Sequence, residues 1–251
     1  MSEIPAIWKE ERLIESFEVD MFARLRPHTL LGLLLNGAWN AARGSVYGYE
    51  ELSRRNLMWV LVKVQIEIRR MPGWHEQVIL ETWGKRVERL YALRDFAVAT
   101  PAGERMASAT TLWMVLDRNS GRPQRLDPEA DGFPWMPGRE ELATSLEKVP
   151  PLEGGRETAR YRVKFSDIDV NRHVNAARYL QWLVDSERKA VQEEKEPESI
   201  EISYLAEAVA DEEVAVYADD DGKSPGLVSI RRAGDGKELC RGRIGWRDRS
   251  A

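Results

Sequence analysis

The sequence predicts an α+β protein with two tandem repeats, each a long helix packed on an antiparallel sheet. Two observations lead to this fold class. A helix-like segment followed by several strand-like segments occurs twice within the 251 residues. An offset of about 145 residues also lays Thr29–Arg43 on Val174–Arg188 and His28 on His173, which indicates an internal duplication. A sheet of this kind buries one face, and a single amphipathic helix lying across it covers that face.

The first repeat begins with a short strand at Ser16–Asp20 and continues with a helix at Thr29–Arg43. Apolar residues recur in that helix at i, i+3 and i+4, and Pro27 stands just before it, where a helix start tolerates proline. Alternating apolar residues predict a long strand over Leu57–Arg70. Further strands are expected at Val78–Trp83, Leu90–Thr100 and Glu104–Asp117.

The middle of the chain is rich in proline and contains Gly154-Gly155, so we expect a linker with one short helix at Arg139–Leu146. The domain boundaries are therefore an N-terminal repeat over residues 1–135, a linker over 136–157 and a C-terminal repeat over 158–251. The second repeat is expected to place a strand at Ala159–Phe165 before a helix at Asn175–Lys189. The strands expected after it are Ser199–Leu205, Glu213–Ala218, Gly226–Arg232 and Glu238–Arg247.

Composition excludes several classes of protein. With 43% hydrophobic and 31% charged residues, the chain has enough apolar material to fold. One cysteine, Cys240, excludes a disulfide framework and a multi-cysteine metal site, and three histidines argue against a histidine-rich one. We therefore expect no metal. A net charge of −5 argues against a dedicated nucleic-acid binder.

The N-terminus lacks the basic-then-apolar pattern of a signal peptide. The apolar run Leu30–Leu35 is too short to span a bilayer. We expect a cytoplasmic protein that does not bind membranes.

One segment concentrates chemistry just ahead of the second helix. Within Phe165–Asn175, Asp169, Asn171 and His173 alternate, so an extended stretch places them on one side. Asn175 is expected to be the N-cap of the helix. The backbone amides beyond it favour a developing negative oxygen.

The run Asp169–Asn175, followed by Tyr179 and Trp182, resembles the signature of the acyl-ACP (acyl carrier protein) thioesterases, a plant-type family with bacterial relatives. Segments of the first half agree with that family's N-terminal repeat: Ser53–Val60, Pro72–Trp74, Thr82-Trp83 and Arg94–Phe96. The resemblance implies a double hotdog fold. It also implies hydrolysis of the thioester between a fatty acyl chain and acyl carrier protein in fatty acid biosynthesis, and no cofactor is expected.

The resemblance carries the catalytic residues over position by position. The family's Asp-x-Asn-x-His corresponds to Asp169, Asn171 and His173, and its further acidic residue corresponds to Glu207. Many plant members carry cysteine after that glutamate. Here the position is Ala208, which excludes a cysteine nucleophile there.

The chemistry assigns a role to each residue. A thioester leaves as a thiolate, whose conjugate acid has a pKa of roughly 8.5, so strong general-acid help is not obligatory. Glu207 is the expected base or nucleophile, and the sequence leaves these two roles open. Asn171 donates to the water or the oxyanion, and His173 orients Glu207 or protonates the sulfur. Asp169 fixes the side chain of Asn171 or His173.

The first repeat lacks this set, because Arg24 and Arg26 stand where the offset places Asp169 and Asn171. We therefore expect it to shape the acyl pocket. Small and bulky residues of the first helix are assigned to substrate binding: Gly32, Leu35, Asn36 and Trp39. Cys240 lies in an expected strand and is expected to be buried and unreactive.

Three other readings stay open. An acyl-CoA thioesterase would cleave the same phosphopantetheine thioester, a non-catalytic protein would only bind acyl groups, and a hotdog dehydratase would release no thiol. The partner implied by the main reading is acyl carrier protein, which is acidic and bears the fatty acyl chain. Chain-length preference and the formation of a homodimer are left open.

Overall fold

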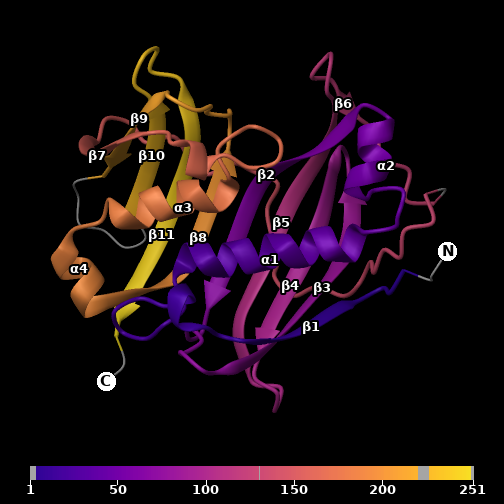
Figure 1. Ribbon diagram of the computed structural model, residues 1–251, viewed down its shortest axis with the longest axis horizontal. Helices are drawn as coiled ribbons and strands as arrows, with labels where there is room; N and C mark the ends of the chain where they lie inside the picture. The colour runs from indigo at the N-terminus through magenta and orange to yellow at the C-terminus, as the bar shows by residue number, and fades with distance from the viewer. Residues whose placement is uncertain (1–3, 130, 220–225, 250–251) are drawn as a thin grey trace. The chain divides into compact units, whose positions relative to one another are not determined.

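The computed structural model describes residues 4–129, 131–219 and 226–249 (Figure 1). The chain divides into two compact units. Unit 1 comprises Met1–Arg26, Leu30–Val64 and Arg69–Leu146, and unit 2 comprises Pro27–Thr29, Gln65–Ile68 and Glu147–Ala251. Within the described ranges, no helix has both the length and the apolar character needed to cross a bilayer.

The sheet of unit 1 is built from long antiparallel strands. Hydrogen bonds connect β1, β3, β4 and β5 in that order, β2 lies next to β5, and the two-residue β6 pairs with β5. Its strands are β1 (Trp8–Leu13), β2 (Leu57–Ile68), β3 (Gln77–Glu88), β4 (Tyr91–Ala99), β5 (Arg105–Asp117) and β6 (Pro123–Gln124). Of the five strands expected in the first repeat, the four that follow the helix are confirmed, with ends that differ by a few residues.

Helix α1 (Pro27–Ala42) lies across this sheet (Figure 1), which confirms the helix expected at Thr29–Arg43. Its buried face is Leu30, Leu31, Leu34, Gly37, Ala38, Ala41 and Ala42. Gly37 lets the helix approach β3 closely, because a Cβ there would lie 2.7 Å from Cδ2 of Leu80. The short helix α2 (Tyr49–Arg54) follows.

Unit 2 repeats the plan with shorter strands. Hydrogen bonds connect β8, β11, β10, β9 and β7 in that order, all antiparallel. The strands are β7 (Arg156–Arg162), β8 (Lys195–Tyr204), β9 (Glu213–Ala218), β10 (Gly226–Arg232) and β11 (Glu238–Asp248). Helix α3 (Ala176–Asp185) packs on this sheet at Gly242, where a Cβ would lie 2.9 Å from Cδ1 of Leu183.

The strand expected at Ser16–Asp20 is wrong. The chain forms a 3-10 turn, η1 (Ser16–Glu18), because the buried Glu18 carboxylate accepts a hydrogen bond of 2.9 Å from the Glu15 N–H. Glu18 also pairs with Arg12 at 2.9 Å. The strand of this region is β1, which lies earlier and which the sequence analysis missed.

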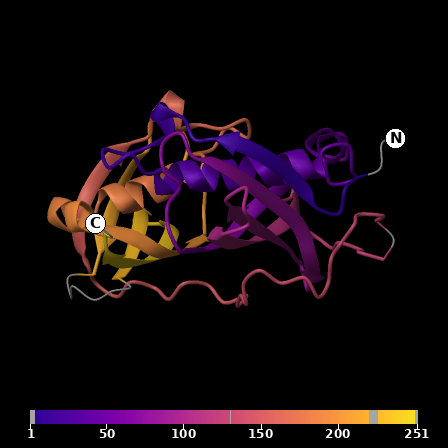
Figure 2. The same cartoon turned by 90° about the horizontal axis from the view of Figure 1, so that it is seen from below.

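Two further expectations about helices are wrong. The second long helix ends at Asp185 and a short helix, α4 (Lys189–Glu194), follows, because the Ser186 hydroxyl donates to the Leu183 carbonyl at 2.8 Å. Residues 139–146 form no helix, and the chain between β6 and β7 runs without helix or strand over its described residues (Figure 2). Side chains of the unit 1 sheet bind the 139–146 backbone instead: Lys85 Nζ donates to the Leu142 carbonyl at 2.6 Å.

The internal duplication is visible in the loop that precedes each long helix. The Asp20 N–H donates to the Arg24 carbonyl at 2.8 Å in unit 1, and the Asp169 N–H donates to the His173 carbonyl at 2.9 Å in unit 2. Arg24 therefore corresponds to His173, and the expected pairing of His28 with His173 is wrong. Matching the apolar residues of two helices fixes their register only within a turn, whereas backbone hydrogen bonds fix it residue by residue.

Candidate active site

The residues expected to be catalytic lie on a tight turn of unit 2 that follows a 3-10 turn, η2 (Phe165–Asp167). The Asp169 carboxylate accepts a hydrogen bond from the Asn171 N–H at 2.8 Å. Arg172 adopts a left-handed conformation with φ 67°, and the chain returns so that Asp169 pairs with His173 through the backbone. The expected extended stretch is wrong. Asp169 holds the turn through its own backbone and carboxylate, as aspartate often does.

Helix α3 begins directly after this turn. The Asn175 side chain accepts a hydrogen bond from the Ala177 N–H at 2.9 Å, which confirms it as the N-cap. The Asn175 carbonyl accepts from the Arg178 N–H at 2.9 Å. Two amides of the first helical turn are thus already bonded within the helix start, which reduces the number that could donate to a ligand oxygen.

The structure brings His173 and Glu207 together. His173 Nε2 lies 3.1 Å from Glu207 Oε2, and the two side chains are 29% and 46% exposed. Asn171 precedes His173 by two residues. Its half-buried side chain makes no hydrogen bond to any other residue in the described part of the chain. The site therefore combines a paired carboxylate and imidazole with a nearby amide whose donors are available to a ligand.

The peptide between Glu207 and Ala208 is held at both of its polar atoms. Arg232 Nη2 donates to the Glu207 carbonyl at 2.9 Å, and the Ala208 N–H donates to the Tyr179 hydroxyl at 2.9 Å. The Val174 N–H then donates to the Ala208 carbonyl at 3.0 Å. These three bonds fix the backbone from which the Glu207 side chain extends. Tyr179 is buried, and burial raises the pKa of its hydroxyl, so it stays neutral as an acceptor.

Replacing Tyr179 with phenylalanine should lower kcat about tenfold and leave KM nearly unchanged, because a buried N–H left without its acceptor costs about 1–3 kcal/mol and loosens the Glu207 peptide. Steady-state kinetics on an acyl thioester measure both constants. Tyr204→Phe is the matched control, since the Tyr204 hydroxyl donates to the Ala176 carbonyl rather than to this peptide. An equal loss in the two variants would mean a general packing effect.

The corresponding loop of unit 1 carries none of these functional groups beyond Asp20. The Asp20 carboxylate accepts a hydrogen bond of 2.9 Å from the N–H of Phe22. Phe22 therefore stands where unit 2 has Asn171. The Leu25 N–H donates to the Pro72 carbonyl at 2.8 Å, as Val174 does to Ala208, so Met71 stands in the place of Glu207. The carboxylate–imidazole pair thus belongs to unit 2.

One of the four residues assigned to substrate binding lines a cavity of unit 1. Trp39 contributes to an aromatic cavity of about 40 Å³, together with Trp59, Trp113 and Phe133. Gly32, Leu35 and Asn36 are not among the lining residues; Asn36 is exposed, and a Cβ at Gly32 would meet nothing within 4 Å. Their part in binding stays a prediction.

Cys240 is fully buried in β11, and burial raises the pKa of its thiol. Cys240→Ser should therefore keep its turnover and lose about 1–3 kcal/mol of stability from burying a hydroxyl. Ala208→Cys should give no faster enzyme, because position 208 is also fully buried. Thiol-release assays with a urea titration test both statements. Loss of turnover in a well-folded Cys240→Ser protein would remove Glu207 from its leading role.

Sequence reasoning missed the support around Glu207. Arg232 is the second of two adjacent arginines in the sequence, and nothing local to it indicates a bond to a residue 25 positions earlier. Tyr179 belonged to the quoted signature, but the sequence did not show that its hydroxyl meets the Ala208 amide. The first contact joins β10 to the loop after β8, and the second joins α3 to that same loop, so both depend on the tertiary fold.

Two family models cover most of the chain. The acyl-ACP thioesterase N-terminal domain matches residues 5–131, and the acyl-ACP thioesterase C-terminal domain matches residues 153–248. The chain belongs to the acyl-ACP thioesterase family. An acyl-ACP thioesterase from Bacteroides thetaiotaomicron is similar to this family member at 27% identity and a TM-score of 0.87, over 98% of this chain and 100% of that one. The 12:0-ACP thioesterase from Umbellularia californica shares the fold at 21% identity and a TM-score of 0.85, over 99% and 100% of the two chains.

Two plant proteins are among the curated relatives of this acyl-ACP thioesterase family member. The chloroplastic palmitoyl-acyl carrier protein thioesterase of Gossypium hirsutum is 26% identical over 270 residues, which are 98% of this chain and 65% of the relative. The chloroplastic oleoyl-acyl carrier protein thioesterase 2 of Arabidopsis thaliana is 26% identical over 284 residues, 97% of this chain and 77% of the relative. The chain thus spans less than two thirds of the cotton relative. The predicted fold class, an α+β double hotdog with two helix-and-sheet repeats, is confirmed.

Proposed function

We propose that this protein hydrolyses the thioester of fatty acyl-acyl carrier protein and releases free fatty acid and carrier protein, as a step of fatty acid biosynthesis. The observation that carries the proposal is the 3.1 Å pair of His173 and Glu207 in a chain of this family. We keep Asp169, Asn171, His173 and Glu207 as the catalytic set, with Asp169 acting through the backbone of the turn. A cytoplasmic location remains the expectation from the sequence.

The site supports a direct hydrolysis. Glu207 accepts a proton from a water, whose oxygen bonds to the thioester carbon while the carbonyl oxygen becomes an oxyanion. The Asn171 amide is the donor assigned to that oxyanion, because its N–H groups are not engaged by the described residues. The intermediate then re-forms its carbonyl as the C–S bond breaks, and the proton that Glu207 took from the water passes through His173 to the leaving thiolate. In the second route Glu207 attacks the carbon itself and water cleaves the resulting anhydride.

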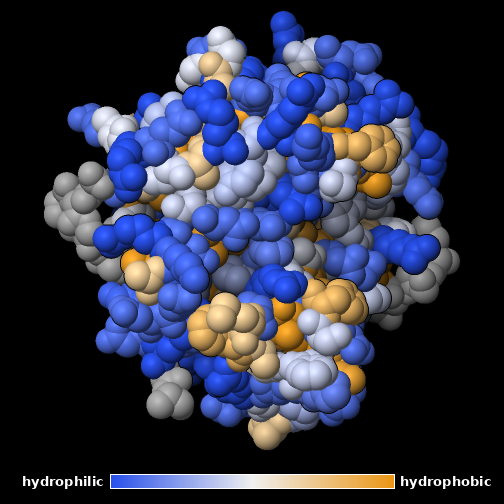
Figure 3. Space-filling view, turned by 60° about the vertical axis from the view of Figure 1, so that its left-hand side comes forward, coloured by the Kyte–Doolittle hydropathy of each residue, from blue (hydrophilic) through white to orange (hydrophobic). Residues whose placement is uncertain are grey.

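The carrier protein is the proposed partner, and the exposed surface beside the turn suits an acidic one. Phe165 is 92% exposed and Val170 is 76% exposed, next to the exposed cations Lys164 and Arg172. Figure 3 shows one face of the molecule, on which apolar side chains form separate patches on a mainly hydrophilic surface. Small apolar contacts with a rim of cations favour a transient acidic partner.

We assign the acyl chain to the aromatic cavity of unit 1. Trp39→Ala should therefore move the chain-length preference towards longer chains, since removing the indole enlarges the cavity. Discrimination is worth about 1–3 kcal/mol per methylene, so the shift should be graded. Leu33→Ala serves as the comparison, because Leu33 lies on the same helix and does not line the cavity. A profile that Leu33→Ala moves and Trp39→Ala does not would contradict the assignment.

Release of free thiol from acyl-carrier proteins and from acyl-CoAs of graded length tests the function. We expect kcat/KM to be higher for the carrier-protein thioesters. Faster turnover of the CoA thioesters would make the protein an acyl-CoA thioesterase. Tight binding without thiol release would make it an acyl-binding protein. Either result would overturn the proposal, and gel filtration at the same time determines whether the protein is a homodimer.

A further inference from the structure

We propose that Tyr47, held in place by Asp131, is a partition between two cavities of unit 1 and limits the length of the acyl chain that the enzyme accepts. This inference rests on the proposed function, because it needs the acyl chain to enter unit 1. It adds two residues that determine specificity, and neither was indicated by the sequence. The argument starts from the cavities on the two sides of the tyrosine.

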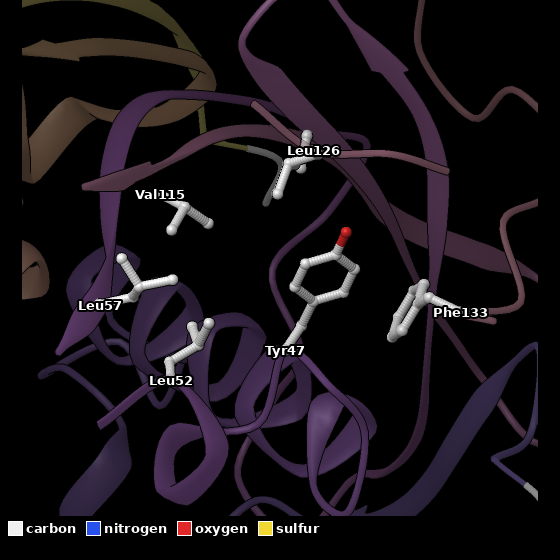
Figure 4. Close-up of a cluster of buried hydrophobic side chains, with 7 residues drawn as sticks. Tyr47, Leu52, Leu57, Val115, Leu126 and Phe133 are labelled. Carbon is white, nitrogen blue, oxygen red and sulfur yellow. The ribbon is translucent and has the colours of Figure 1, made fainter. Parts of the chain in front are cut away.

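Tyr47 lines both cavities. The first, of about 40 Å³, has the aromatic walls described above. The second, of about 280 Å³, is lined by aliphatic side chains that include Leu52, Leu57, Val115 and Leu126. Figure 4 shows the Tyr47 ring between the group formed by Leu52, Leu57 and Val115 and the ring of Phe133.

The difference in volume gives the partition its consequence. A buried water needs about 10–15 Å³ by this measure, so the first cavity holds only a few groups of that size. An acyl chain that fills the first cavity can extend further only by entering an adjacent cavity. The second cavity is several times larger, and the Tyr47 ring, which is 6% exposed, stands between the two. Displacing or removing that ring would join them.

One carboxylate holds the ring in this position. The Tyr47 hydroxyl donates to Asp131 Oδ2 at 2.6 Å, and the Trp135 indole Nε1 donates to the same oxygen at 3.1 Å. The Phe133 N–H donates to Asp131 Oδ1 at 2.8 Å. The Asp131 carboxylate thus connects the ring of Tyr47, the backbone of Phe133 and the ring of Trp135. Charge-assisted bonds of this kind are stronger than neutral ones.

The strand beneath is shaped to receive this cluster. At Gly84 of β3 a Cβ would lie 2.8 Å from Cε1 of Phe133 and 2.9 Å from Cε3 of Trp135, so only glycine admits the two rings. The Tyr47 ring completes the group, with its centroid 5.7 Å from that of Phe133 and 6.2 Å from that of Trp135. The Tyr47 ring is therefore held by packing against the rings of Phe133 and Trp135 and by the hydrogen bond from its hydroxyl to Asp131.

The far cavity also has a polar border, which would end the extension. Arg55, Gln124, Arg125 and Asp127 are among its lining residues. An apolar chain gains free energy along the aliphatic wall and loses it on meeting these polar groups. Opening the partition should therefore admit a defined additional length of chain.

The test compares kcat/KM for octanoyl and hexadecanoyl carrier protein in the full-length enzyme and its variants. Tyr47→Ala should raise the hexadecanoyl-to-octanoyl ratio about tenfold or more. Asp131→Ala leaves the ring but removes its anchor, and should raise the ratio by a smaller factor. Tyr47→Phe should raise the ratio by a factor no larger than that of Asp131→Ala, because it removes the bond from Tyr47 alone, whereas Asp131→Ala also frees the donors of Phe133 and Trp135. Tyr91→Ala is the matched control, because this tyrosine of unit 1 lies on β4 and lines neither cavity, and it should leave the ratio unchanged.

A second readout does not depend on turnover. Quenching of tryptophan fluorescence by free fatty acids reports binding, because Trp59, Trp113 and Trp135 line the first cavity. The variants should gain affinity for hexadecanoate relative to octanoate in the same order as above. If the wild-type enzyme releases no thiol, the proposed function fails while the binding series still tests the partition. Folded Asp131→Ala and Tyr47→Phe proteins whose kinetic and binding ratios match those of the wild type would overturn it.

Discussion

Glu207→Ala should lower kcat for acyl-carrier-protein hydrolysis by about 10²–10⁴-fold, the range expected when a general base is removed. Glu207 lies 3.1 Å from His173 and its backbone is bonded on both sides, so truncation removes a carboxylate from a preformed site. Asn171→Ala should give a loss of about 10²–10³-fold, because it removes the donor assigned to the oxyanion. Initial rates of thiol release measure both losses.

The matched control is Glu213→Ala, a change of the same kind near the site at a side chain that is 56% exposed and lies 3.8 Å from Arg160. It should keep wild-type turnover. Far-UV circular dichroism has to show that every variant is folded. Wild-type turnover in a folded Glu207→Ala protein would contradict the assigned chemistry. Mass spectrometry of the quenched enzyme then distinguishes the two routes, since only the nucleophilic one adds an acyl group to Glu207.

Asp95→Ala should lower the free energy of unfolding by about 3–5 kcal/mol, because it removes the buried carboxylate that pairs with the buried Lys85. The Glu140 carboxylate, 3.5 Å from Nζ, is 47% exposed and compensates the charge less well. Lys85 and Asp95 are 1% and 0% exposed, and Nζ lies 3.4 Å from Oδ2. Asp95 also accepts hydrogen bonds of 2.6 Å from the Thr110 hydroxyl and 2.7 Å from the Glu141 N–H. Removing the carboxylate thus leaves two more donors without their acceptor and removes one of the bonds that hold the 139–146 segment on the sheet.

Urea titration measures this loss. Glu88→Ala on the same strand as Lys85 is the control, because the Arg86–Glu88 pair is partly exposed and a pair of that kind is worth about 0–1 kcal/mol. The double variant Lys85→Met/Asp95→Ala should lose less than the two single changes together, since it leaves no unpaired charge. A cost near that of Glu88→Ala would mean that water reaches the pair.

Strands of the sheet could be predicted from the sequence because each carries its own periodicity. The apolar alternation within Leu57–Ile68 is local and survives in β2. By contrast, β1 contains four charged residues in six and is half-buried, so it carries little of the apolar signal. The break after Asp185 depends on one hydroxyl bonding back to the helix. The composition and the apolar spacing of a segment do not reveal a single hydrogen bond of this kind, so they cannot predict where the helix ends.

Some features of the candidate site could likewise be predicted from the sequence, and others could not. The pairing of His173 with Glu207 followed from a resemblance, which carries three-dimensional information that spacing lacks. The turn around Asp169 could not be predicted, because it depends on the left-handed backbone of Arg172, and arginine has no preference for that conformation. The bonds of Arg232 and Asp131 join residues that are distant in sequence, so a single chain without aligned relatives gives no sign of them.

The loop of unit 1 shows that the backbone of the site is separable from its chemistry. On this loop, the substitutions Phe22→Asn and Arg24→His would introduce an amide and an imidazole at the positions that correspond to Asn171 and His173. The third change, Met71→Glu, meets a different environment: Met71 is 3% exposed, whereas the Glu207 side chain is 46% exposed. A carboxylate at position 71 would be desolvated and held in its protonated, unreactive form. Supplying the amide and the imidazole would therefore not be enough to copy the candidate site into unit 1, because the third position is buried.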